Sequence, residues 1–365
     1  FLRKAVRPLR QAALMTMHAL AVKYGSQLQA STLASFVEEA SPLVNDSDLT
    51  LASAALSSLE SVVTVQPSTA PVVVGKTVPH AMTLVRSPLL QGGALEHLQG
   101  FLKALVKSSE AAGGVASFQS LLDELLASGR TAGTATGGKT AQQSVAVCVA
   151  VLCSTAGPQH VQSTTDLLVK EVKAKTQDTT AQRLALLCLG EIGRRADLSG
   201  IPQVESTVSE SLKADSEEIK GAASLALGGV ACGNLGKYMP SLIRQISSAA
   251  KSSPKQQYLL LTALSEVITT CSERANLLLS PDDQGQVLSL LLGSAEGEEE
   301  CRTVVAECLG RLALLSPEKV LAELRQRISN PSPNMRAVVR YCTGWGLMRC
   351  WAFLGPGSWV FMGQR

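Results

Sequence analysis

The stretch that decides the fold is Gln182-Arg-Leu-Ala-Leu-Leu-Cys-Leu-Gly190. Two later stretches share its character, Ile219-Lys-Gly-Ala-Ala-Ser-Leu-Ala-Leu-Gly228 and Cys301-Arg-Thr-Val-Val-Ala-Glu-Cys-Leu-Gly310, and all three end in Leu-Gly. Leu and Ala outnumber β-branched residues in them, and apolar side chains extend around most of a helical surface. A helix of this kind is buried on several sides, so we predict that these stretches are second helices of repeated helical hairpins.

The hairpins recur along the chain at a fairly regular interval. Seven apolar runs align on one leucine-like position, and the aligned positions lie 37 to 51 residues apart. This spacing scatters around the period of about 40 to 47 residues that is typical of HEAT and armadillo arrays. The predicted fold class is therefore all-α, an α-solenoid, or superhelix, of HEAT/armadillo-type helical-hairpin repeats. The aligned positions are Leu56, Leu98, Val149, Leu189, Leu227, Leu264 and Leu309.

Three regions follow from this pattern. Residues 1–340 are expected to hold about eight HEAT repeats, with the first and the last incomplete. Residues 128–139 are rich in Gly, Thr and Ala and are predicted to form an exposed loop between two helices. Residues 341–365 contain all three Trp and have no repeat register, so we expect a non-native or disordered tail, from an altered reading frame or an unspliced intron, with a natural truncation as the alternative. The chain as a whole reads as a segment of a longer protein.

The amino-acid composition argues against several classes of function. The chain has 365 residues, of which 45% are hydrophobic and 17% charged, with a net charge of +3, so it has material for a core. The near balance of charge argues against binding to nucleic acid or to a membrane surface. No apolar run is long enough for a transmembrane helix. The nine cysteines form no C-x-x-C pair, which favours free thiols in a reducing compartment.

One motif of enzymes has to be weighed. Gly133-Thr-Ala-Thr-Gly-Gly-Lys-Thr140 matches the phosphate-binding loop G-x-x-x-x-G-K-[ST]. Such a loop follows a buried strand, whereas Phe118 to Leu126 has helical periodicity. The four histidines lie far apart and at no spacing typical of metal ligands. We therefore predict no enzymatic activity, no catalytic or metal-binding residues and no cofactor.

Basic residues near the second helices are the remaining candidates for function. We predict that they form a ridge that faces an extended partner from the concave side of the array. The alternative is ordinary solubilising charge, with Arg194 and Arg195 complementing the dipole at a helix C-terminus. The candidate partner-binding residues are Arg183, Arg194, Arg195, Lys220 and Lys255, with Arg311 as a further basic position.

Four stretches carry a family resemblance over roughly residues 1–340. They are Ser87-Pro-Leu-Leu-Gln-Gly-Gly-Ala-Leu95, the run from Leu184 to Ser199, the run from Glu217 to Leu235, and Lys255-Gln-Gln-Tyr-Leu-Leu-Leu261. Together they resemble the cullin-associated, neddylation-dissociated proteins, which are long HEAT-repeat exchange factors. The chain corresponds to part of the C-terminal half of that family.

The resemblance implies a function. Members of this family are non-catalytic scaffolds that bind unneddylated cullin-RING complexes and promote the exchange of substrate-receptor modules in SCF-type ubiquitin ligases. The implied partners are a cullin and its RING subunit, in competition with adaptor and substrate-receptor modules, and not nucleic acid or membrane. The resemblance also implies a monomeric protein of the cytoplasm and nucleus. The alternative is a HEAT-repeat scaffold with a different cargo, of the transport or phosphatase type.

Overall fold

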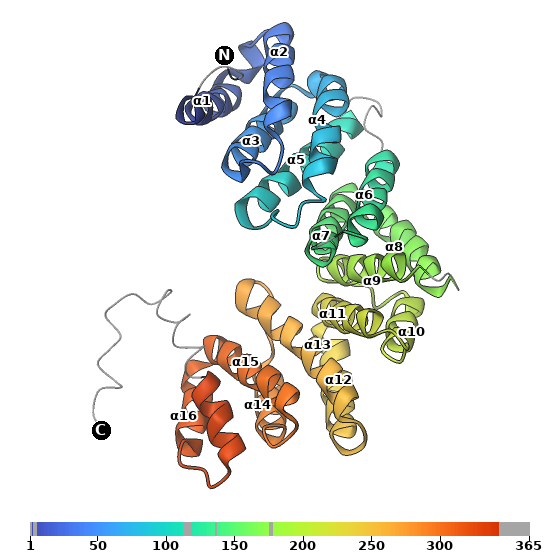
Figure 1. Ribbon diagram of the computed structural model, residues 1–365, viewed down its shortest axis with the longest axis vertical. Coiled ribbons are helices and arrows are strands. Elements are labelled where there is room, and N and C mark those ends of the chain that lie inside the picture. Colours follow the sequence, from blue (N-terminus) through green and yellow to red (C-terminus); the bar gives the residue numbers. More distant parts are fainter. Residues whose placement is uncertain (1, 3–5, 112–117, 136, 175–177, 343–365) are drawn as a thin grey trace, which may run out of the picture. The chain divides into compact units, whose positions relative to one another are not determined.

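The computed structural model describes residues 2, 6–111, 118–135, 137–174 and 178–342. These residues form sixteen α-helices, three short 3-10 helices and a last helical run at 333–342, and they contain no strand (Figure 1). The chain divides into two compact units, Phe1–Ala196 and Asp197–Arg365. Each unit is a stack of helical hairpins, so the predicted α-solenoid class is confirmed.

In the first unit, the second helix of each hairpin packs on the second helix of the next. The row formed in this way is α1, α3, α5, α7 and α9, and the first helices α2, α4, α6 and α8 each pack against the second helix that follows them. The 3-10 turns Gly25–Gln27, Ser41–Leu43 and Pro67–Thr69 join helices near the start. The helix bounds are α1 Arg7–Tyr24, α2 Ala30–Ala40, α3 Leu49–Val65, α4 Ala70–Leu84, α5 Gly92–Ala111, α6 Phe118–Gly133, α7 Gly138–Ala156, α8 Pro158–Lys173 and α9 Thr179–Gly193.

The second unit repeats the same plan. Helices α11, α13 and α15 form its row of second helices, while α10, α12 and α14 are the corresponding first helices. Helix α16 packs on α15 and precedes the run 333–342. The bounds are α10 Pro202–Ser211, α11 Glu217–Gly233, α12 Leu235–Ser252, α13 Pro254–Glu273, α14 Pro281–Gly293, α15 Glu299–Leu315 and α16 Pro317–Arg327.

The aligned leucine-like positions all lie on second helices. They fall on α3, α5, α7, α9, α11, α13 and α15, one to a helix. Six of them are at most 1% exposed, and Leu227 is half-buried. Burying a Leu or Val side chain stabilises a fold by about 1.5 to 3 kcal/mol, so the six buried positions contribute to the free energy that joins one hairpin to the next.

The loop predicted at residues 128–139 is wrong over most of its length. Helix α6 continues to Gly133, and Ser128, Gly129 and Ala132 are buried on it. Their small side chains are needed for close packing rather than for a loop, because a Cβ atom on Gly129 would lie 2.7 Å from Leu184 Cδ2. The connection between the helices is only residues 134–137, and Gly137 takes the left-handed conformation there with φ of 79°.

Glycines inside helices also serve packing, as Gly228 of α11 shows. A Cβ atom there would lie 2.6 Å from the Ala263 carbonyl oxygen of α13, so only glycine allows the two helices to approach so closely. Gly221 of the same helix carries no such constraint, because a Cβ atom added to it would meet no atom within 4 Å.

Two further predictions concern the membrane and the tail. No single helix in the described part of the chain is long and apolar enough to span a membrane; α3 and α4 pass that test only together, and the chain bends by 118° between them. The prediction of a tail from residue 341 is wrong for Tyr341 and Cys342, which belong to the last helical run. The rest of it, residues 343–365, lies outside the described residues.

Candidate interaction surface

Arg194 and Arg195, two of the predicted partner-binding residues, lie at the C-terminal end of α9 and share one carboxylate. Arg195 Nη1 donates to Glu191 Oε2 at 2.6 Å and to the Glu191 carbonyl oxygen at 3.0 Å, while Arg194 Nε lies 3.4 Å from Glu191 Oε1. The Glu191 side chain is 7% exposed, and the two arginine side chains are 14% and 18% exposed. Gln143 of α7 also donates to Glu191 Oε1.

This arrangement fixes the end of α9 on α7. A carboxylate that is buried is tolerated because cations and hydrogen bonds compensate its lost hydration. The two arginines therefore serve the interior of the first unit, and little of either guanidinium remains for a partner.

Lys220 and Lys255 also share a carboxylate, but an exposed one. The two ammonium groups lie 3.1 Å and 2.6 Å from Glu217 Oε1, and the Glu217 side chain is 62% exposed. The hydrogen bonds from Lys255 and Lys220 hold the pKa of Glu217 below its ordinary value. Lys255 is 63% exposed and Lys220 17%. Lys255 at the start of α13 is therefore the member of the predicted set that presents the most surface to a partner.

Arg183 acts within the first unit. It donates to the side-chain oxygen of Gln142, a residue with no exposed surface, and at 3.4 Å to the Lys139 carbonyl. The Gln142 amide in turn donates to the carbonyls of Gly129 and Thr180. Arg183 thus completes the hydrogen bonding of a buried amide between α7 and α9. Arg311 similarly donates to Ser265 and Thr269 of α13.

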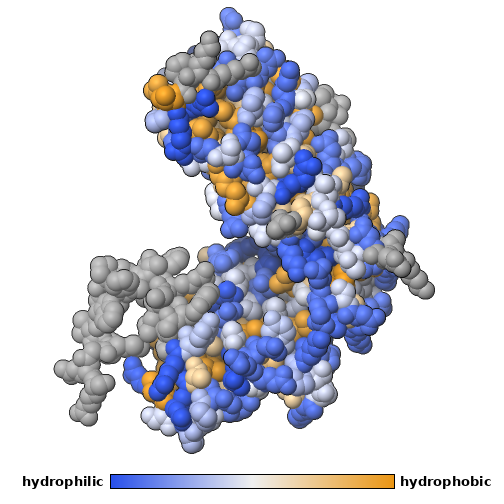
Figure 2. Space-filling view, in the orientation of Figure 1, coloured by the Kyte–Doolittle hydropathy of each residue, from blue (hydrophilic) through white to orange (hydrophobic). Residues whose placement is uncertain are grey.

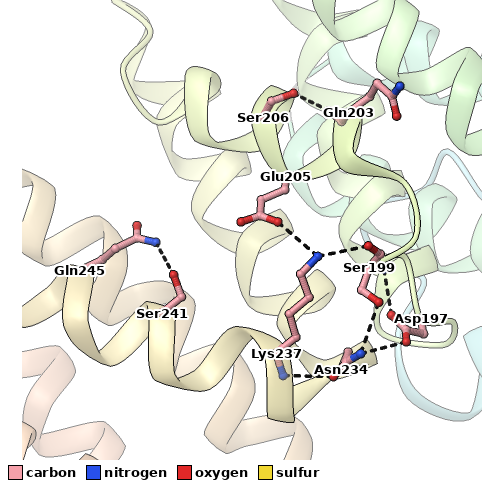
Figure 3. Close-up of polar contacts among 9 residues, drawn as sticks. All are labelled: Asp197, Ser199, Gln203, Glu205, Ser206, Asn234, Lys237, Ser241 and Gln245. Atoms are coloured by element: carbon pink, nitrogen blue, oxygen red, sulfur yellow. Dashed lines mark hydrogen bonds and ion pairs between the residues drawn. The ribbon is translucent and has the colours of Figure 1, made fainter.

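A polar network at the start of the second unit was not predicted from the sequence (Figure 3). Asn234 caps α12 by accepting from Lys237 N, and its amide donates to Asp197 Oδ2 at 3.0 Å and to Ser199 Oγ at 3.3 Å. The Lys237 ammonium donates to the Ser199 carbonyl at 3.1 Å and pairs with Glu205 at 3.5 Å. The network ties α12 to the segment before α10 and to α10 itself.

The charges in this network are set by their neighbours. Burial disfavours the ionised form of Asp197, but hydrogen bonds from Ser199 and Asn234 outweigh burial and lower the pKa of its carboxyl group. Burial likewise opposes the charge on Lys237, while Tyr238 and Glu205 raise the pKa of its ammonium above the ordinary value. The signal that predicts part of this network is Asn234 itself, since Asn is a favoured N-cap before a helix.

Helix α1 exposes several large apolar side chains, which the sequence patterns did not reveal (Figure 2). It buries only Leu14 and Ala21, whereas α3 buries nine residues. Helix α1 therefore leaves several large apolar side chains in contact with solvent. Its exposed large side chains, including the residue before the helix, are Val6, Leu9, Met15, Leu20, Val22 and Tyr24.

The phosphate-loop motif spans the connection between two helices, α6 and α7. Gly133 ends α6 and Gly138 begins α7, so a helix and not a strand precedes the motif. A Cβ atom on Gly138 would overlap the Ala132 carbonyl oxygen, which accounts for that glycine by packing. The geometry on which phosphate binding depends, a strand followed by a loop of amides, is not formed by the described residues of this motif.

The described cysteines and acidic residues offer little reactive chemistry. Burial raises the pKa of Cys148, Cys271 and Cys308 to about 12, and that of Cys153 to about 11, so these thiols stay protonated. Across the ranges that the structure describes, no three His, Cys, Asp or Glu side chains gather as a metal site would require.

Stacked helical hairpins define a helical-repeat protein. In its fold the chain is similar to a chain of the solved Kap95:Nup1 complex, with a TM-score of 0.52 and 12% identity over 96% of this chain and 47% of that chain. That likeness concerns the fold alone.

Sequence comparison identifies the relatives of the chain. It is 42% identical over 346 residues to Cullin-associated NEDD8-dissociated protein 1 of Arabidopsis thaliana and 35% identical over 362 residues to the protein of that name from Drosophila melanogaster. Each match covers 93% of this chain but 28% of the relative. No family model matches the chain. The chain is homologous to a C-terminal portion of the cullin-associated NEDD8-dissociated proteins, and the predicted resemblance is confirmed.

Proposed function

We propose that the chain is part of a non-catalytic scaffold that binds unneddylated cullin-RING complexes and promotes the exchange of substrate-receptor modules in SCF-type ubiquitin ligases. The observation that carries the proposal is homology along nearly the whole chain to proteins named for cullin association and NEDD8 dissociation. Because the chain spans 28% of their length, the proposal assigns it one part of the contact with the cullin and its RING subunit.

The mechanism is competition for surface. A scaffold that occupies cullin surface overlapping the site of an adaptor speeds the dissociation of that adaptor in a ternary complex, and no bond is made or broken. The stacked hairpins suit this role because each offers one helix face to an extended partner. We also propose that the protein is a monomer and that it acts in the cytoplasm and the nucleus.

Among the five basic residues, the geometry favours different roles. Lys255 is exposed and pairs with an exposed carboxylate, so it is the residue that we assign to direct contact with the cullin-RING complex. Lys220 supports it through Glu217. Arg183, Arg194 and Arg195 lie in networks inside the first unit and act as positioning residues for α9.

The test is direct binding of this chain to purified cullin-RING complexes, with and without NEDD8, by biolayer interferometry. We expect binding to the unmodified complex and weaker binding to the modified one. Binding that is equal for both forms, or absent for both, would contradict the proposal for this part of the protein. Preferential capture of a transport or phosphatase cargo would favour the alternative scaffold function.

A matched pair of variants tests the assignment of Lys255. Lys255→Glu changes an exposed charge on a second helix, and Lys251→Glu makes the same change at an exposed position on α12, a first helix. Charges at the rim of an interface act mainly on the association rate. We expect a several-fold slower association for Lys255→Glu and no change for Lys251→Glu. Equal rates for the two variants would remove Lys255 from the contact.

A further inference from the structure

Three first helices of the second unit enclose an open groove of about 990 Å³. Helix α14 supplies most of its lining, while α12 and α16 supply the two sides and the start of the run 333–342 closes part of it. The volume lies at the upper end of the range of about 300–1,000 Å³ that is typical of ligand pockets. The groove is therefore large enough to hold part of another molecule.

The side of α14 that faces the groove carries small residues. Gly285, Ser289 and Gly293 line the groove and recur every four positions, so they lie along one face of the helix. A Cβ atom on Gly293 would meet no described atom within 4 Å, and one on Gly285 would meet only the movable end of Lys319. Glycine weakens a helix relative to alanine, and packing within the described chain requires neither glycine. Both leave the backbone of α14 open to close approach from outside.

Apolar side chains border this open backbone. Ile243 of α12 and Leu290 of α14 are partly exposed and line the groove, and Met335 lines it from the run 333–342. Methionine is flexible and adapts to the shape of a bound group. An open groove with apolar walls is the kind of surface on which an amphipathic helix places its apolar face.

The charges of the lining leave one cation without a partner. Glu323 and Arg327 of α16 form an ion pair with each other. Asp282 lies in the first turn of α14, where the helix dipole favours a carboxylate. Within the described residues, Lys319 of α16 has no ion pair, and its ammonium lies 2.9 Å from the place that a Cβ atom on Gly285 would take. A positive charge therefore stands beside the open backbone of α14.

We propose that this groove binds an acidic amphipathic helix of a partner protein. The apolar face of that helix lies against α14, and one of its carboxylates pairs with Lys319. Complementary charge favours an acidic segment over a basic one and speeds its association. The groove lies on first helices, whereas Lys255 lies on a second helix, so the inference goes beyond cullin-RING binding and does not depend on it.

Two labelled helical peptides test the choice of occupant by fluorescence anisotropy with the intact chain. They share an apolar face of Leu and Ala and differ in their flanking residues, which are Glu in one peptide and Lys in the other. We expect saturable binding of the Glu peptide, about tenfold tighter than that of the Lys peptide and weaker at high salt. No saturable binding of the Glu peptide, or equal affinity for both peptides, would overturn the proposal.

A matched pair of charge reversals tests the role of Lys319. Lys319→Glu should weaken binding of the Glu peptide several-fold and strengthen binding of the Lys peptide. Lys213→Glu makes the same change at an exposed position between α10 and α11, outside the groove, and should alter neither affinity. If both variants bound the two peptides as the unaltered chain does, Lys319 would not face the occupant and the proposal would fail.

A second pair of variants tests whether the floor of the groove is the contact. Gly293→Leu fills the open space above α14, and we expect it to weaken binding of the Glu peptide about tenfold with unchanged helical circular dichroism. Gly221→Leu is the control, because that position on α11 is equally open but does not line the groove. Unchanged binding by a folded Gly293→Leu variant would overturn the proposal. If that variant did not fold, the charge reversals would decide.

A second copy of the chain is the competing occupant. Sedimentation velocity of the intact chain, of Gly293→Leu and of Gly221→Leu distinguishes the two cases. A dimer that only Gly293→Leu dissociates would assign the groove to contact between copies and overturn the proposal. A monomer that binds the Glu peptide with one-to-one stoichiometry supports it.

Discussion

Glu191 and Glu217 present the same pairing in two different environments. Each carboxylate holds two basic residues of the predicted partner-binding set, within one unit and on a second helix or at its start. Glu191 is 7% exposed on α9, whereas Glu217 is 62% exposed on α11. The sequence patterns differ little, since in each case basic residues lie three or four positions away or on the neighbouring hairpin.

The difference lies in hydration. Around Glu191, water cannot replace a lost partner, so removing one charge leaves the others buried and uncompensated. Around Glu217, water and salt replace the partners readily, so the pairs contribute little to folding, and the exposed side chains of Glu217 and Lys255 can rearrange. The buried set therefore belongs to the scaffold, and the exposed set is the one suited to a partner.

Glu191→Gln tests the buried side of this contrast and should have the largest effect. We expect the free energy of unfolding of the first unit to fall by about 3 kcal/mol, the lower end of the range for breaking a buried ion pair, because both guanidinium groups keep some solvent contact. Urea unfolding followed by circular dichroism measures the change. A loss below about 1 kcal/mol would show that Glu191 behaves like a surface carboxylate.

A contrast between a buried, crowded position and an open one can also be tested within α11, the helix that carries Glu217. Gly228→Ala places a methyl group against the Ala263 carbonyl oxygen, and we expect it to cost about 1 to 3 kcal/mol through overpacking. Gly221→Ala meets no atom and should instead stabilise the helix by about 0.5 to 1 kcal/mol. Thermal unfolding of the two variants gives opposite shifts in Tm if the close approach of α11 and α13 is as described. Shifts of the same sign would contradict it.

Much of the fold followed from the sequence, because burial in a repeat depends on local periodicity. The aligned leucine-like positions predicted the second helices, and all but Leu227 proved fully buried. The loop at 128–139 failed because small residues have two meanings. Gly weakens an isolated helix, and Ala gives it no large apolar face, so a stretch rich in both is typical of a loop. In the fold, however, small side chains at Gly129 and Ala132 allow α6 to pack closely on neighbours that are distant in sequence.

The candidate site was less accessible to sequence reasoning. Arg194 and Arg195 were recognised as basic, and Glu191 lies three and four positions before them, which is the spacing of helical ion pairs. The burial of Glu191 could not be predicted from the sequence, because it depends on the packing of α9 against α7. The network of Asp197, Asn234 and Lys237 joins residues more than thirty positions apart, so only the folded hairpins bring it together.

Asp48 provides an intermediate case, because it is a helix cap as well as a charge. It accepts from Thr50 N and Leu51 N at the start of α3 and pairs with Arg7. The hydrogen bond from Arg7 lowers the pKa of Asp48 from 3.8 to about 2. Its contribution to stability is therefore complete above pH 3.8 and is lost as the pH falls towards 2.

Two substitutions separate the cap from the charge. Asp48→Ala removes both and should cost about 1 kcal/mol at neutral pH. Asp48→Asn keeps a capping side chain, so it should cost less at neutral pH, and the acid unfolding of the first unit should become less steep between pH 3.8 and about 2. Unfolding curves at a series of pH values measure both effects. An Asn variant with the full acid dependence would assign that dependence to other groups.

Glu217→Gln should have the smallest effect on stability and so completes the comparison with Glu191→Gln. The pKa of Glu217 is held below its ordinary 4.5, so its pairs with Lys220 and Lys255 stabilise the fold above that pH and lose their effect as the pH falls through the lowered pKa. Because Glu217 and Lys255 are exposed, we expect no measurable change in unfolding at neutral pH, and none of the salt dependence that a strong pair would show. Binding should respond instead, since the substitution releases two ammonium groups from their carboxylate. We expect faster association with the unmodified cullin-RING complex at low salt and unchanged urea unfolding, which would identify Glu217 as part of an interaction surface and not of a structural ion pair. A loss of stability comparable with that of Glu191→Gln would contradict the distinction between the two sites.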